Sequence, residues 1–235
     1  MNMKRISFAA SVFLVLASVI AQAQDMNELI KKAKNKLDQV RDYQATAILK
    51  LNVSFLQVPD SKVVVYYKQP DKFRVVQQKG ISIVPRGGVS INLNTILNGK
   101  GYTAIDAGSA TMNGKQLRII KLLPLAEESE VVLSTMYIDP QSYLVKKIVS
   151  TTKENGSYTI EFIYGKFSSW ALPDELLFTF NIKDYKLPKG MTFDYDNEIK
   201  ADTSGLKSSK GEVRIVFNQY TINKGVNDEV FRLKP

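Results

Sequence analysis

An alternation of apolar and polar residues with a period of two constrains the fold of this chain more than any other feature. It is clearest after Tyr43, where every second residue is apolar: Ala45, Ala47, Leu49, Leu51, Val53 and Phe55. A period of two is typical of a β-strand with one buried face. Since this segment is roughly twice as long as the usual strand of five or six residues, we expect a large and strongly curved sheet.

The same pattern recurs along most of the chain and is interrupted by turn sequences. Gln-Pro-Asp at 69–71, Asn-Gly at 98–99, Asp-Pro at 139–140 and Glu-Asn-Gly at 154–156 predict hairpins and a meander. Further predicted strands are 62–68, 73–78, 90–97, 102–105, 131–138, 143–151, 158–164, 176–182, 191–195 and 212–222. In all, we expect about ten or eleven antiparallel strands.

Two segments fit this alternation less well. Residues 117–130 begin like a strand, but Pro124 followed by Leu-Ala-Glu-Glu is also compatible with the first turn of a helix. We therefore predict a strand followed by a short internal helix or plug. Residues 197–210 are rich in Asp, Ser, Gly and Lys, which predicts a surface loop.

The first residues have the form of a secretory signal peptide. Lys4 and Arg5 precede an apolar run at 6–20 that ends in Ala-Gln-Ala at 21–23. The run is shorter than the roughly twenty residues that span a bilayer. We expect cleavage after Ala23, export, and a single domain over 24–235.

A helical pattern precedes the first strand. Asp-Met-Asn-Glu at 25–28 resembles a capping box, and Leu29, Ile30, Ala33, Leu37 and Val40 recur at helical spacing. The other face carries Lys31, Lys32, Lys34 and Lys36. These lysines indicate either an ordinary solvated face or contact with a membrane.

The composition excludes several kinds of chemistry. The chain has no histidine and no cysteine, so the commonest metal ligands, the usual catalytic base and the thiol nucleophile are missing. We expect no cofactor and no enzymatic activity; a hydrolase would have to use carboxylates such as Asp194/Asp196 or Glu127/Glu128. The net charge of +9 favours anionic membrane surfaces or acidic head groups over nucleic acid, which an exported protein does not meet.

Several motifs resemble those of the LolA/LolB-like periplasmic carriers of outer-membrane lipoproteins. They follow the signal, helix and long strand in the order found in that family. The matching segments are Pro-Asp-Lys-Phe-Arg at 70–74, Gly-Lys-Gly-Tyr at 99–102, a meander over 136–167, Leu-Pro-Asp-Glu-Leu at 172–176 and Val-Asn-Asp-Glu-Val-Phe at 226–231. The resemblance covers nearly all of the chain after residue 23.

The resemblance implies a mainly β (α+β) fold, an incomplete β-barrel whose apolar concave face is covered by the N-terminal helix and a short internal helix. It implies a monomeric periplasmic carrier that shelters acyl chains of a lipoprotein or related lipid. Such a carrier receives its cargo from an inner-membrane release complex and passes it to an outer-membrane acceptor. A lipid-sensing regulator and a surface module that binds polysaccharide remain alternatives.

The predicted site is the apolar cavity beneath the helix. Its predicted lining is Leu29, Ile30, Ala33, Leu37, Leu49, Leu51, Val53, Phe55, Val63, Val65, Phe73, Val75, Ile91 and Leu93. Each of these side chains is also compatible with simple core packing. By resemblance, Arg74 is expected to latch the lid in the closed state; the alternation leaves open whether Arg74 instead lies exposed on the outer face.

Overall fold

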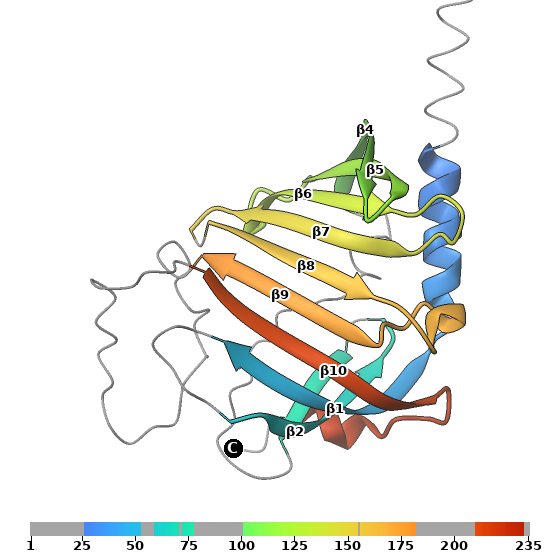
Figure 1. Ribbon diagram of the computed structural model, residues 1–235, viewed down its shortest axis with the longest axis vertical. Coiled ribbons are helices and arrows are strands. Elements are labelled where there is room, and N and C mark those ends of the chain that lie inside the picture. Colours follow the sequence, from blue (N-terminus) through green and yellow to red (C-terminus); the bar gives the residue numbers. More distant parts are fainter. Residues whose placement is uncertain are drawn as a thin grey trace, which may run out of the picture.

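A computed structural model describes residues 26–52, 59–70, 72–77, 101–154, 156–181 and 210–232. In this part of the chain, ten strands form one antiparallel sheet (Figure 1). The strands are β1 (Asp42–Asn52), β2 (Ser61–Lys68), β3 (Lys72–Gln77), β4 (Tyr102–Met112), β5 (Lys115–Pro124), β6 (Val131–Ile138), β7 (Val145–Thr152), β8 (Ser157–Ile163), β9 (Glu175–Asn181) and β10 (Lys210–Ile222).

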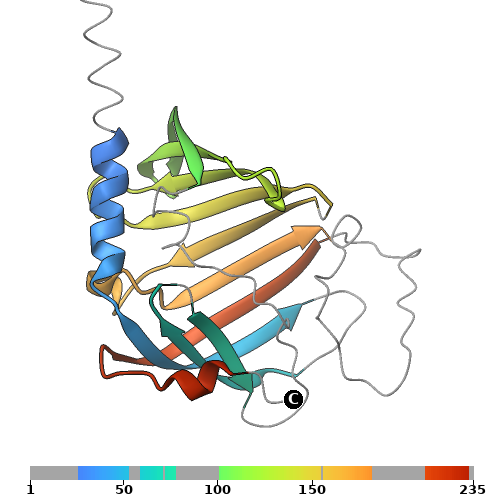
Figure 2. The same ribbon diagram turned by 180° about the vertical axis from the view of Figure 1, so that it is seen from behind.

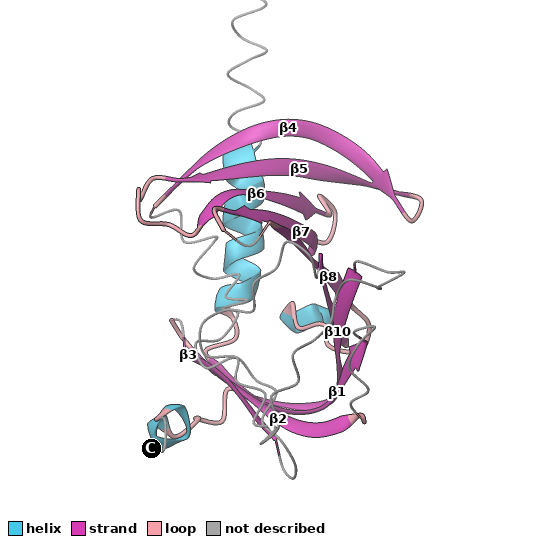
Figure 3. Cartoon of the chain, turned by 90° about the vertical axis from the view of Figure 1, so that its left-hand side faces the viewer, coloured by secondary structure: helices cyan, strands magenta, loops and turns pink. Residues whose placement is uncertain are grey.

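The sheet is not closed. Its strand order is β3-β2-β1-β10-β9-β8-β7-β6-β5-β4. The first and last of the described strands, β1 and β10, therefore pair in its interior, while β3 and β4 form its edges. Figure 3 shows the sheet curving from β4 and β5, past β8 and β10, to β1 and β2. The predicted fold class, an incomplete barrel of antiparallel strands with an N-terminal helix, is confirmed.

The N-terminal helix spans residues 26–38. It runs along one end of the strands, beside the turn between β6 and β7 (Figures 1 and 2). Met26, Leu29 and Ala33, spaced three and four residues apart, are buried in the same core as the sheet. The predicted amphipathic helix is therefore present, and its apolar stripe faces the strands. No helix in the described part of the chain is both long and apolar enough to cross a membrane.

One predicted element is wrong. Residues 125–130 form turns, not the short helix expected after Pro124, and Leu125 is 66% exposed. Pro124 is instead the last residue of β5 and pairs with Tyr102 of β4. The few residues left before β6 cannot repay the cost of helix nucleation. Short 3-10 helices occur elsewhere, at η1 (Ser168–Trp170) and η2 (Asp228–Phe231).

Strand β4 is longer than the predicted 102–105 and continues to Met112. A two-residue turn, Asn113-Gly114, then leads into β5, with φ of 52° and 74°. Positive φ at both residues is the geometry for which Asn-Gly is favoured in hairpins. The predicted signal peptide, the strands at 90–97 and 191–195, and the loop at 197–209 lie outside the described residues.

Candidate functional site

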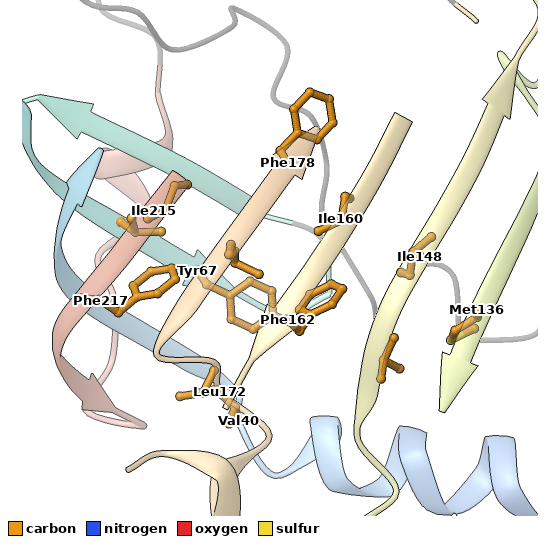
Figure 4. Close-up of a cluster of buried hydrophobic side chains, with 14 of the residues drawn as sticks. Val40, Tyr67, Met136, Ile148, Ile160, Phe162, Leu172, Phe178, Ile215 and Phe217 are labelled. Carbon is orange, nitrogen blue, oxygen red and sulfur yellow. The ribbon is translucent and has the colours of Figure 1, made fainter. Parts of the chain in front are cut away.

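The concave face of the sheet carries a largely apolar surface. Alternation places Ala45 and Ala47 of β1 on one face, and the strand register sets Ala45 beside Val65 of β2 and Tyr220 of β10. Ala45, Val65 and Tyr220 are buried, with exposures of 1%, 0% and 7%. Figure 4 shows buried side chains from β6 to β10 and β2 on this same side, with Phe162 and Tyr67 facing each other across it.

Most of the predicted lining residues face this one core. Leu29, Ala33, Leu49, Val63 and Val65 are buried members of the cluster, and Ile30, Leu37, Leu51, Phe73 and Val75 are partly buried against it. Val53, Phe55, Ile91 and Leu93 lie outside the described residues. The structure thus brings ten predicted side chains to a common apolar core, five from each of these two groups.

An apolar cavity of about 80 Å³ opens at the end of this core nearest the C-terminus of the helix. Its lining combines the helix end, the strands β1, β2, β3, β8, β9 and β10, and the segment that joins β8 to β9. The lining residues are Leu37, Val40, Tyr43, Tyr67, Phe73, Phe162, Trp170, Ala171, Leu172, Pro173, Leu176, Phe217 and Tyr220. Leu37 and Phe73 belong to the predicted set, whereas the other aromatic residues of the lining do not.

A β-bulge explains why the sequence pattern missed part of this aromatic lining. Thr46 pairs with Gln219 but Ala47 pairs with Phe217, so Asn218 is an extra residue on β10. The bulge shifts the alternation by one position, and both Phe217 and Tyr220 therefore point into the core. A strict period of two places these two side chains on opposite faces.

The aromatic side chains of the cavity pack against one another. The ring of Tyr220 lies 5.2 Å from Tyr43, 5.0 Å from Phe217 and 4.9 Å from Phe167, measured between centroids. Its hydroxyl donates to the Pro173 carbonyl over 2.7 Å. Burial raises the pKa of Tyr220, so this phenol stays neutral and the cavity wall carries no charge there.

A buried pair of hydroxyls interrupts the apolar face between β6 and β7. Ser134 and Ser150 are 3% and 2% exposed, and their Oγ atoms lie 2.8 Å apart. Each hydroxyl thus satisfies the other, which removes most of the cost of burying them. Nearby, burial raises the pKa of the Tyr158 phenol, partly opposed by a hydrogen bond with Ser150.

Arg74 lies on the outer face of the sheet. It pairs with Tyr66, whereas its neighbours Phe73 and Val75 pair with the buried Tyr67 and Val65. The Arg74 Nη1 donates to the carbonyl oxygens of Val230, over 2.5 Å, and Arg232, over 2.6 Å.

The segment that Arg74 binds is η2, which packs on β3 (Figure 2). The side chain of Lys72 adds an ion pair to Asp228 at 2.8 Å. Arg74 is thus bonded to backbone carbonyls, as expected of a latch, but those carbonyls belong to the C-terminal segment and not to the N-terminal helix. Its role as a lid latch stays a prediction.

Acidic side chains do not assemble a metal site in the described part of the chain, where no group of three or more potential ligands occurs. Glu127 and Glu128 are exposed in the turn after β5. Asp194 and Asp196 lie outside the described residues.

Comparison with known proteins gives structural neighbours only. The sequence matches no family model and no curated protein. An outer membrane lipoprotein-sorting protein domain from Vibrio parahaemolyticus superposes with a TM-score of 0.57 and 10% identity, covering 87% of this chain and 95% of the other. A LolA superfamily protein from Nitrosomonas europaea has a TM-score of 0.54 and 9% identity, covering 86% and 97%.

A DUF1329 family protein from Desulfovibrio piger is similar to the same extent, with a TM-score of 0.56, 12% identity and coverage of 88% and 95%. At these identities the likeness concerns the fold alone. The open ten-stranded sheet with its N-terminal helix is thus similar in fold to these three solved proteins.

Proposed function

We propose that this protein is a non-enzymatic carrier that shelters an acyl chain of a lipoprotein or related lipid between its concave sheet and its N-terminal helix. The observation that carries the proposal is the largely apolar concave face, covered by a separate amphipathic helix and hollowed by an aromatic cavity. The similar fold of a lipoprotein-sorting domain supports the same function.

The energetics of the helix suit reversible binding. Met26 and Leu29 are buried, and Ile30 and Leu37 are partly buried. At about 1.5–3 kcal/mol for each fully buried side chain, the contacts of the helix with the sheet contribute roughly 5–9 kcal/mol. Sheltering an acyl chain is worth about 0.8 kcal/mol per CH₂, on the order of 10 kcal/mol gross for an ordinary chain. An acyl chain can therefore replace the helix contacts without being held too tightly to release.

The cavity must widen to accept such a chain. Its volume of about 80 Å³ is well below the roughly 300 Å³ at which ordinary ligand pockets begin. The helix contacts the sheet through its apolar side chains and the turn between β6 and β7 through two of its lysines. We propose that the helix moves outward and thereby enlarges the cavity. The empty carrier is then partly filled by its own side chains.

The cellular setting is part of the proposal. The signal-like residues 1–23 support export to the periplasm. There, in this proposal, the chain receives the lipid from an inner-membrane release complex and delivers it to an outer-membrane acceptor. The resemblance of the sequence motifs to LolA/LolB-like carriers supports these steps.

The test is whether the mature protein holds acyl chains. Native mass spectrometry of the exported protein, followed by lipid extraction, should reveal a co-purified acyl species, and the emptied protein should take up a fluorescent fatty acid. Leu37→Gln, which places an amide in the cavity wall, should weaken uptake about tenfold. Asn35→Gln, at an exposed position of the same helix, should leave uptake unchanged. A protein that stays empty and takes up no fatty acid would disprove the proposal.

A further inference from the structure

A second, polar cavity lies on the other side of the helix end. It has a volume of about 360 Å³ and is formed by the helix, the start of β5, the turn from β6 to β7, the start of β7, and the segment from the end of β8 into η1. Its lining residues are Lys36, Lys115, Asp139, Ser142, Leu144, Lys146, Tyr164, Ser168 and Ser169. Three ammonium groups and three serine hydroxyls thus surround a space in the size range of small ligand sites.

Two of these lysines, Lys36 and Lys146, differ from neighbouring lysines in their partners. On the helix, Lys32 pairs with Glu28 at 2.8 Å and Lys34 pairs with Asp38. Lys36 has no carboxylate partner among the described residues and donates to the Ser142 carbonyl over 3.0 Å.

The same contrast occurs on β7. Lys147 pairs with Glu161 at 3.3 Å. Lys146, on the opposite face, forms no ion pair in the described structure and lies over the Tyr164 ring, 4.7 Å from its centroid. Lys36 and Lys146, which line the cavity, thus form no ion pair in the described structure, whereas Lys32, Lys34 and Lys147 each do.

The charges in the cavity are not balanced from within. Burial lowers the pKa of Lys146, and repulsion from Lys115 and Lys36 lowers it further. Asp139 opposes this effect in part, but its Oδ1 already accepts the backbone N–H groups of Gln141 and Ser142, over 2.9 and 3.2 Å. Three positive charges face one carboxylate, and this arrangement favours a bound anion.

The polar cavity adjoins the apolar one. Lys36 lines the polar cavity and Leu37 the apolar one, and the same holds for Ser169 and Trp170. At the end of β8, the rings of Phe162 and Tyr164 stack with centroids 6.4 Å apart, and Phe162 lines the apolar cavity while Tyr164 lines the polar one. A ligand with an apolar chain and a charged head can therefore occupy both at once.

We propose that the polar cavity binds the phosphate of an anionic lipid head group while the acyl chain of the same lipid occupies the apolar cavity. This inference rests on the proposed carrier function and specifies the chemical class of its cargo. The ammonium groups of Lys36, Lys115 and Lys146 donate to the phosphate oxygens, and the serine hydroxyls supply further donors. Uncharged lipids with the same acyl chain lack these contacts.

The experiment compares two lipids that share a myristoyl chain: lysophosphatidylglycerol, which carries a phosphodiester, and monomyristoylglycerol, which does not. Binding of each is measured by titration calorimetry with the mature protein, and inorganic phosphate is titrated in a third arm. The variant Lys36→Gln/Lys146→Gln removes two cavity charges. The matched control Lys34→Gln/Lys147→Gln removes the same charge from the same two elements but outside the cavity.

The wild type and the control should bind the phospholipid about tenfold more tightly than the neutral lipid, and the cavity variant should lose that preference. Equal binding of both lipids in all three proteins would overturn this inference and leave the carrier function standing. If neither lipid binds, the carrier function fails. In that case, binding of inorganic phosphate that the cavity variant alone loses would assign the polar cavity to free phosphate. If phosphate does not bind either, both the carrier function and this inference are refuted.

Discussion

The contact between Arg74 and the C-terminal segment provides a prediction that can be worked through in numbers. In Arg74→Leu, the carbonyls of Val230 and Arg232 lose a donor that reaches them over 2.5 and 2.6 Å. Hydrogen bonds from a charged group contribute about 1.5–3 kcal/mol each, and we take about 2 kcal/mol for the partly exposed pair. The ion pairs that Lys68 and Lys72 form with Asp228 are exposed and screened, and cannot compensate for this loss.

The expected result is that η2 detaches from β3 more often. A loss of about 2 kcal/mol corresponds to roughly thirtyfold faster hydrogen exchange in peptides that cover 226–232, measured by mass spectrometry. Lys72→Leu, which removes one charge from the same strand, should change exchange far less. Unchanged protection in Arg74→Leu would refute the assignment of these bonds. If protection falls but acyl uptake and release keep their rates, Arg74 anchors the C-terminus and does not latch the lid.

Three further changes test the polar groups in and around the core. Ser150→Ala should lower the free energy of unfolding by about 1–3 kcal/mol, since Ser134 loses its hydroxyl partner, and Ser134→Ala/Ser150→Ala should cost less than the sum of the single changes in denaturant titrations. Tyr220→Phe should cost about 1–2 kcal/mol in the same assay because the buried Pro173 carbonyl loses its donor. Hydrogen bonds from Ser142 and from the backbone N–H groups of 141 and 142 outweigh burial and lower the pKa of Asp139. The ionised Asp139 therefore stabilises the fold above the ordinary carboxyl pKa, and this stabilisation is lost as the pH falls below about 4. In Asp139→Asn, the melting temperature should depend less on pH in this range.

The period-two pattern predicted most of the sheet because large apolar residues alternate along its central strands. The predicted strand at 131–138 is β6 as observed, and 212–222 falls within β10. The pattern failed at β4, where the residues after Ile105 are mostly small or polar. There the strand depends on pairing with β5, including an ion pair of Asp106 with Arg118, which no local propensity encodes.

The candidate site was predictable only in part, for a related reason. The helix stripe and the odd residues of β1 and β2 follow simple periods, and they face the common core. The side of the sheet on which Arg74 lies depends on the register that pairs it with Tyr66. The side chain of Tyr220 faces the core because of a bulge in β10. The polar cavity joins lysines from three elements far apart in the sequence, so only the fold reveals it.

The central claim is that an acyl chain occupies the space between the helix and the concave face. Trp170 is the one tryptophan in the sequence, lines the apolar cavity and is 40% exposed. Tryptophan fluorescence therefore comes from a single position, at the wall of this cavity. A fatty acid brominated along its chain, which quenches on contact, should quench Trp170 in a saturable manner, and the same fatty acid without bromine should not. Binding of the brominated chain without any quenching would contradict the account.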